Sequence, residues 1–182
     1  MSLRRALTDL LLLDDRTFRT RLPAFLDENG LDAERPDRAV ADGSPDDATA
    51  AVAGLDDPTP LERELVWRVR VLDDVPFGLT LSGPAYEDNP IRYANRTFRR
   101  LSGYSMAELR GENPRLLQGP ETAAGPVADL REALDIWEPV TVTLRNYRKD
   151  GTPFRNRVSL VPLEDDTGTV TNWIGIQEAI DD

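Results

Sequence analysis

The stretch PVTVTLRNYRKDGTPFRNRVSLVPL, residues 139–163, decides the fold. On each side of KDGT, apolar and polar residues alternate, as they do in strands that bury one face. The Asp150-Gly151 pair is a strong signal for a tight hairpin turn. The stretch therefore predicts two long antiparallel strands, and TVTNWIGIQEA, which follows the EDDTG turn, predicts a third strand beside them.

The residues before this hairpin predict two more strands, VPFGLTLS and IRYAN. Turn and capping signals then predict helices at 95–103, 105–111 and 127–135. This order of elements predicts an α+β fold, with a five-stranded antiparallel sheet and helices packed on one of its faces.

The chain divides into three segments. Residues 1–58 show helical spacing of leucine and phenylalanine but no strand pattern, so we expect a helical or irregular N-terminal extension. It is either a regulatory or dimerising cap or a partly flexible acidic tail. Residues 59–74 predict a flanking helix that begins with a capping box at Thr59 and Glu62, and residues 75–180 form the main domain.

Composition excludes several classes of function. The net charge is −11, with 33 acidic residues against 22 basic ones and a single lysine, Lys149. Such a surface suits the cytoplasm of an extreme halophile, the alternative being an ordinary acidic protein from a GC-rich genome. It disfavours direct contact with nucleic acid. The absence of cysteine and histidine excludes disulfides, thiol nucleophiles, the usual zinc sites and Ser-His-Asp chemistry. No apolar run is long enough to cross a membrane, and we expect a cytoplasmic protein.

Three carboxamides fall on the apolar side of the last three predicted strands: Asn146, Asn156 and Gln177. A buried amide costs free energy unless its hydrogen bonds are met. The pattern therefore indicates either a planar polar ligand or a sheet face open to water. Arg115 and Arg131 add guanidinium groups that suit a phosphate, although arginines in an Arg-rich chain are also ordinary surface charges.

Four motifs give the chain a family resemblance: DNPIRYANRTFRRLSGYS, GENPRLLQGPET, LRNYRKDGTPFRN and NWIGIQ. From about Val75 to Ile180, these motifs resemble, in order and spacing, the PAS domains of the light-oxygen-voltage (LOV) class of flavin photoreceptors. The resemblance implies a PAS fold and FMN as the cofactor, with FAD as the alternative.

The resemblance also assigns the residues of the cofactor site. It places the isoalloxazine ring against Asn113, Gln118, Asn146, Asn156 and Gln177, and the phosphate against Arg115 and Arg131. Thr80 and Ser82 fall where the family lines the pocket near the reactive edge of the ring, and Leu116 replaces a usual aromatic in the pocket wall.

One position departs from the family. Its motif reads like GRNCRFLQG, and the cysteine forms a light-induced bond to the flavin, whereas this chain has Pro114 there and no cysteine elsewhere. Asn113 and Pro114 instead predict the N-cap and first residue of a short helix. We therefore expect flavin binding without an adduct.

The function that follows is that of a blue-light receptor, not an enzyme, that signals by photoreduction of the flavin to the semiquinone. Gln177 would respond to the new N5–H by reorienting its amide. The candidate electron donors are Trp137, Trp173, Tyr93 and Tyr104, each of which also suits ordinary core packing.

Three other functions stay open: a redox sensor that does not need light, a flavin-free PAS interaction module and, least favoured, a flavoenzyme. No effector motif is visible in the sequence. We therefore expect the signal to pass through a homodimer or to a separate partner protein.

Overall fold

The hairpin at residues 139–163 forms one edge of the sheet. The structure is a computed structural model that describes residues 2–31 and 49–181. Strand β3 (Val140–Tyr147) pairs antiparallel with β4 (Pro153–Glu164) along its whole length. Gly151 in the connecting turn has φ +87°, in the left-handed region that favours glycine. The predicted Asp-Gly turn is confirmed.

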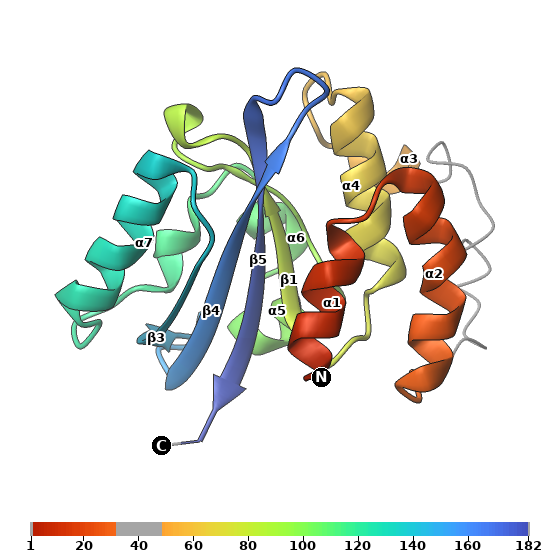
Figure 1. Ribbon diagram of the computed structural model, residues 1–182. Helices are drawn as coiled ribbons and strands as arrows, with labels where there is room; N and C mark the ends of the chain where they lie inside the picture. The colour runs from red at the N-terminus through yellow and green to blue at the C-terminus, as the bar shows by residue number, and fades with distance from the viewer. Residues whose placement is uncertain (1, 32–48, 182) are drawn as a thin grey trace. The chain divides into compact units, whose positions relative to one another are not determined.

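Three further strands complete the sheet: β1 (Gly78–Ser82), β2 (Ile91–Ala94) and β5 (Val170–Ile180). The strand order is β2-β1-β5-β4-β3, and each neighbouring pair is antiparallel (Figure 1). The predicted five-stranded antiparallel sheet is therefore confirmed. The crossover places the last strand, β5, at the centre, where it contacts both halves of the sheet.

The helices that follow β2 lie against one face of this sheet (Figure 1). They are α5 (Arg96–Ser102), α6 (Met106–Leu109) and α7 (Ala124–Ile136), together with the 3₁₀ turn η4 (Pro114–Leu117). A further 3₁₀ turn, η3 (Ala85–Glu87), lies between β1 and β2. The three predicted helices are thus confirmed with shifted ends, and η3 had not been predicted. Under α7, the side chains of Val127 and Leu130 pack against a small core of Val142, Leu144 and Val158.

Asn95 holds β1 to the start of α5. Its side chain is fully buried, and its Oδ1 accepts hydrogen bonds from the backbone N–H groups of Leu79 (2.8 Å) and Phe98 (2.9 Å). Its Nδ2 donates to the carbonyl of Phe77 at 3.0 Å. One N-cap therefore also fixes the strand that carries Thr80 and Ser82.

The described residues up to Val75, 2–31 and 49–75, form a separate helical unit, and the second unit begins at Pro76. The first unit contains α1 (Leu3–Leu11), α2 (Asp15–Glu28), α3 (Thr49–Val52) and α4 (Pro60–Val71). The predicted capping box at Thr59 and Glu62 is present at the start of α4. The helix predicted as a flanking segment thus belongs to the same unit as the helices before it.

Arg68 on α4 connects three helices of this unit through its side-chain hydrogen bonds. Its guanidinium is buried and donates hydrogen bonds to Glu64 (3.2 Å), to Asp15 (2.6 Å) and to the carbonyls of Leu11 (3.0 Å) and Leu13 (2.6 Å). These contacts join α4 to the end of α1 and the start of α2. The N-terminal segment therefore has a folded arrangement of its own in the residues described.

None of the helices in the described ranges is long and apolar enough to cross a membrane.

Candidate functional site

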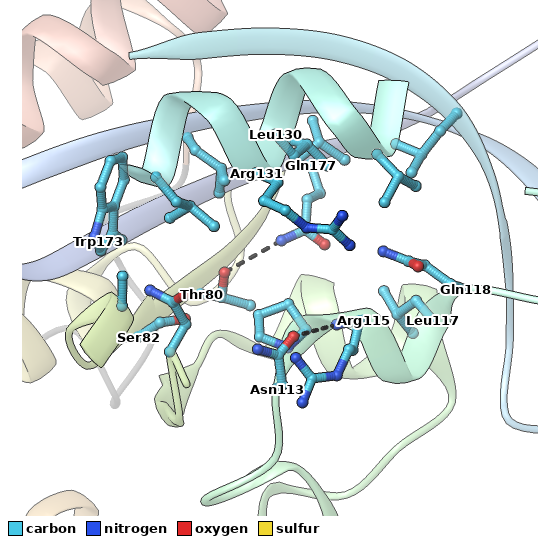
Figure 2. Close-up of a pocket in the computed structure, with 18 of the residues that line it drawn as sticks. Thr80, Ser82, Asn113, Arg115, Leu117, Gln118, Leu130, Arg131, Trp173 and Gln177 are labelled. Carbon is cyan, nitrogen blue, oxygen red and sulfur yellow. Dashed lines mark hydrogen bonds between the residues drawn. The ribbon is translucent and has the colours of Figure 1, made fainter. Parts of the chain in front are cut away.

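A cavity of about 300 Å³ lies within the second unit, between the sheet and the side formed by η4 and α7 (Figure 2). Strands β1, β3, β4 and β5 supply its floor, and η4, α7 and the loop before β2 supply its walls. Small-molecule sites in proteins commonly have volumes of about 300–1,000 Å³. The cavity is therefore large enough to be considered a ligand site.

Most of the residues predicted for the site line this cavity. They are Thr80, Ser82, Asn113, Pro114, Arg115, Gln118, Arg131, Asn146, Asn156 and Gln177. They come from six different elements, separated by up to 97 positions in the sequence, and the fold brings them around one space.

Leu116 is the exception. Its side chain packs against the buried cluster that includes Ile91, Phe98 and Leu109, and it does not line the cavity. The neighbouring Leu117 lines the cavity instead. The physical reason is that η4 is a single 3₁₀ turn, in which neighbouring side chains point about 120° apart. The structure therefore does not place Leu116 among the residues that line this cavity.

Asn146 and Asn156 form a buried amide pair at the floor. Asn156 Nδ2 donates to Asn146 Oδ1 at 2.9 Å, and Asn156 Oδ1 accepts from the backbone N–H of Glu178 at 3.2 Å. Asn146 Nδ2 donates to the carbonyl of Leu117 at 3.2 Å. Each amide thus has protein partners at both ends, and each retains one N–H or lone pair for a further contact.

Gln177 differs from that pair because one end of its amide has no partner. Its Nε2 donates to Thr80 Oγ1 at 3.2 Å, while its Oε1 is buried and has no hydrogen-bond partner among the described residues. Figure 2 shows this oxygen pointing into the cavity. A buried carbonyl without a partner costs about 1–3 kcal/mol. The arrangement favours a ligand that brings a hydrogen-bond donor to this point.

Gly175 keeps open the space that the Gln177 amide occupies. It lies opposite Thr80 in the β1–β5 register, and a Cβ atom at this position would lie 2.5 Å from Thr80 Oγ1 and 3.0 Å from Gln177 Nε2. Any side chain here would push these groups apart. Glycine is therefore required by the Thr80–Gln177 hydrogen bond, not by the turn chemistry that usually explains glycine.

Arg115 and Asn113 are engaged by a residue that the sequence did not single out, Asp88. The Arg115 guanidinium contacts both oxygens of the Asp88 carboxylate, one of them at 2.7 Å. Asn113 Nδ2 also donates to the Asp88 carbonyl (2.7 Å) and carboxylate (3.2 Å). The bond from Arg115 lowers the pKa of Asp88, and the same bond raises the pKa of Arg115. Arg131 lines the cavity separately, from α7 (Figure 2).

Pro114 lies where a short helix begins, as predicted. Asn113 Oδ1 accepts from the N–H of Arg115 at 2.8 Å and caps η4, and Pro114 is its first residue. Proline is favoured at this position because its fixed φ suits the turn and its missing N–H would have no partner. The proline therefore fits the fold and lines the cavity without supplying a reactive group.

The four aromatic residues proposed as electron donors lie in different surroundings. Trp173 lines the cavity and is buried. Tyr93 is buried on β2, and Tyr104 packs beside the cluster around Phe98, neither of them lining the cavity. Trp137 is 64% exposed at the C-terminal end of α7. Trp173 is thus the one of the four that borders the site.

The sequence patterns did not single out several other residues that line the cavity. The polar ones are Asp88, Asn89 and Asp135, and the apolar ones include Leu117, Val127 and Leu130. Asp88 and Asn89 have φ +66° and +47°, and Asp and Asn tolerate this left-handed conformation better than most residues. The DNP sequence (residues 88–90) could have indicated a turn here, but not the contact of Asp88 with Arg115. Among the residues that the structure describes, no cluster of acidic side chains could hold a metal ion.

Comparison with known proteins supports this picture. The sequence profile of the PAS domain matches residues 77–180. A bacterioopsin transcriptional activator of Halobacterium salinarum is 39% identical over 117 residues, which cover 64% of this chain and 17% of that protein. Blue-light-activated histidine kinase 2 of Erythrobacter litoralis is 40% identical over 103 residues, 57% of this chain and 30% of the kinase. The chain thus spans less than a third of the length of these two relatives.

Solved structures show the same fold. A light-oxygen-voltage domain studied with a flavin analogue is 42% identical, with a TM-score of 0.57 over 58% of this chain and 78% of that one. The dark structure of the Aureochrome1 LOV domain is 36% identical, with a TM-score of 0.58 over 70% of this chain and 88% of that one. The profile match covers more than half of the sequence, and the sheet order and the cavity lie within the matched residues. The chain belongs to the PAS domain family, and the relatives and solved structures that it resembles include LOV photoreceptors.

Proposed function

We propose that the chain is a flavin-binding sensor of blue light that signals without a covalent bond between protein and flavin. Two kinds of observation support the proposal. The relatives include proteins named as blue-light-activated kinases and a domain studied with a flavin analogue. The chain itself carries a cavity of suitable chemistry and contains no cysteine.

The unpaired oxygen of Gln177 is the observation that carries the proposal. A flavin ring is planar and has both donors and acceptors along one edge, and it would meet Asn146, Asn156 and Gln177 on the cavity floor. The N–H groups and lone pairs that these amides retain suit the carbonyls and N3–H of the pyrimidine part. The space that Gly175 leaves open lies beside the same amide.

The phosphate of FMN would be held by Arg115 and Arg131. Arg131 lines the cavity, and the guanidinium of Arg115 contacts the carboxylate of Asp88. A phosphate and a carboxylate are both recognised by the planar fork of arginine. Arg115 would therefore exchange or share its Asp88 contact when FMN binds, while Arg131 would add the second positive charge.

A bound flavin would supply blue-light absorption and one-electron redox chemistry. No residue of this chain can form a thiol adduct, because the sequence contains no cysteine. The light signal must therefore be a change of charge and protonation within the pocket, to which neighbouring polar groups respond.

Gln177 and Thr80 can respond to such a change by exchanging hydrogen-bond donor and acceptor roles. In the present arrangement Gln177 Nε2 donates to Thr80 Oγ1. A hydroxyl can both accept and donate, so Thr80 can pair with Nε2 in one amide orientation and with Oε1 in the other. The amide can rotate without losing this partner, and it then presents either its oxygen or its N–H groups to the ligand. Because β5 is the central strand, the change reaches both of its neighbours.

The output is proposed to pass to a second copy of the chain or to a separate partner protein. The chain matches a minor part of relatives that are named as kinases and as a transcriptional activator. In this chain the sensor would act through association with a protein that performs the response.

The test is to remove the Gln177 amide. We expect Gln177→Leu to change the stability of the ligand-free protein little, because loss of the hydrogen bond from Nε2 to Thr80 is offset by removal of the buried, unpaired Oε1. The same change should weaken FMN binding by about 0.5–1.5 kcal/mol, up to roughly tenfold in Kd. Fluorescence titration with FMN and urea unfolding of the ligand-free protein measure the two effects.

Asn172→Leu is the matched control. Asn172 lies on β5 with its side chain on the opposite face of the sheet, and it donates to the carbonyl of Ser82 at 3.2 Å. This change should lower stability and leave FMN affinity almost unchanged. Equal losses of affinity in both variants, or no loss in Gln177→Leu, would contradict the proposed contact.

A further inference from the structure

Trp173 borders the cavity with a large aromatic side chain. It lies opposite Ser82 in the β1–β5 register and is 1% exposed. Figure 2 shows its ring at one end of the cavity, on the wall formed by the sheet. A planar ligand that fills the cavity would therefore lie close to an electron-rich indole.

The indole N–H of Trp173 has an uncommon environment. Its Nε1 is buried and has no hydrogen-bond partner within residues 2–31 and 49–181. Most buried indole N–H groups find a partner. An indole that loses one electron becomes far more acidic at this N–H, but here the N–H is buried and none of the described residues offers an acceptor for the proton. The oxidised indole therefore stays a radical cation.

A buried radical cation beside a reduced ring favours return of the electron. The two opposite charges attract strongly in a site of low dielectric constant, and their recombination removes both charges. Loss of the indole proton would have removed the positive charge and with it this attraction. The geometry therefore supports charge separation that is rapid and short-lived.

We propose that Trp173 is a non-productive electron donor that quenches the excited flavin and limits the yield of photoreduction. This inference rests on the proposed function. One electron passes from the Trp173 indole to the photoexcited flavin and then returns, so that no net oxidation or reduction remains. Lasting photoreduction must use another donor, a residue or solute whose proton can reach water after it is oxidised.

Removing the indole tests the inference. In the flavin-loaded full chain, Trp173→Phe keeps an aromatic ring in the wall but removes the easily oxidised group. We expect the fluorescence lifetime of the bound flavin to rise several-fold and the yield of photoreduction by an added mild reductant to rise with it. Trp137→Phe is the matched control, because Trp137 is exposed and does not line the cavity, and its flavin lifetime should equal that of the wild type.

The outcomes separate this inference from the proposed function. A wild-type chain that binds no flavin overturns both. A chain that binds flavin, but whose lifetime is already long and unchanged in Trp173→Phe, overturns only the role of Trp173. A rise in Trp137→Phe that equals the rise in Trp173→Phe also overturns it.

A second measurement uses the wild type and needs no variant. Ultrafast transient absorption of the flavin-loaded wild type should show an indole radical cation that decays together with recovery of the flavin ground state. A long-lived neutral indole radical would show that Nε1 does lose its proton, and it would overturn the inference.

Discussion

Replacing Pro114 by cysteine is expected to convert the bound flavin from an adduct-free into an adduct-forming chromophore. Pro114 lines the cavity at the first residue of η4, so a side chain at this position borders the ligand. On illumination the new thiol would form a bond from sulfur to flavin C4a, and its proton would pass to N5. We expect reversible bleaching without added reductant, followed by recovery in the dark.

The change should cost little stability. Cysteine is compatible with the first position of a short helix, and loss of the proline constraint removes about 0.4–1 kcal/mol at most. Asn113 keeps the cap, because it bonds the N–H of Arg115 and not that of residue 114. Absorbance during and after blue illumination, with urea unfolding in parallel, measures both effects.

Leu116→Cys provides the control. Leu116 lies two residues further along the same turn but packs against the cluster around Phe98 instead of lining the cavity. A thiol there should form no adduct. An adduct in Leu116→Cys, or none in a flavin-loaded Pro114→Cys, would mean that η4 presents a different face to the ligand.

The second large effect is expected in the helical unit, from Arg68→Met. Methionine keeps much of the side-chain volume but leaves the carboxylate of Glu64 and the carbonyls of Leu11 and Leu13 without this donor. Breaking a buried ion pair by removing one partner typically costs about 3–5 kcal/mol. We therefore expect α1, α2 and α4 to unfold at much lower urea concentration.

Circular dichroism measures this loss of helix, and FMN titration checks the other unit. All residues that line the cavity belong to the second unit, so FMN affinity should remain close to that of the wild type. Arg5→Met removes an exposed arginine that lies 4.0 Å from Asp9, and we expect no measurable loss. If Arg5→Met and Arg68→Met unfold alike, the buried cluster does not hold this unit together.

Much of the fold could be predicted because its signals are local. The alternation on both sides of Asp150-Gly151 determined β3 and β4, and the Thr59 capping box determined the start of α4. The same alternation placed Asn146, Asn156 and Gln177 on one face, which the structure shows to border one cavity. These features depend on residues close together in the sequence, so hydrophobic alternation and helix-capping signals were enough to predict them.

Features that depend on tertiary contacts could not be predicted. Asp88 reaches Arg115 across 27 positions, and only the packed structure brings them together. Leu117, which no sequence feature singled out, lines the cavity while Leu116 does not, because the direction of side chains on a single turn cannot be predicted from two adjacent leucines. Trp137 ends α7 with φ +57°, a conformation usually taken by glycine, and no sequence rule would place tryptophan there.

If the pocket binds a flavin and cannot bond to it, the absorption spectrum of the wild-type chain under blue light will show this. The purified protein, loaded with FMN, should be yellow, and illumination with a mild reductant should produce the semiquinone spectrum faster than the same reductant does in the dark. Failure to take up FMN or FAD, or adduct-type bleaching without a semiquinone, would contradict adduct-free flavin binding by this chain. Equal rates in light and dark would leave the pocket as that of a redox sensor and contradict the role of light.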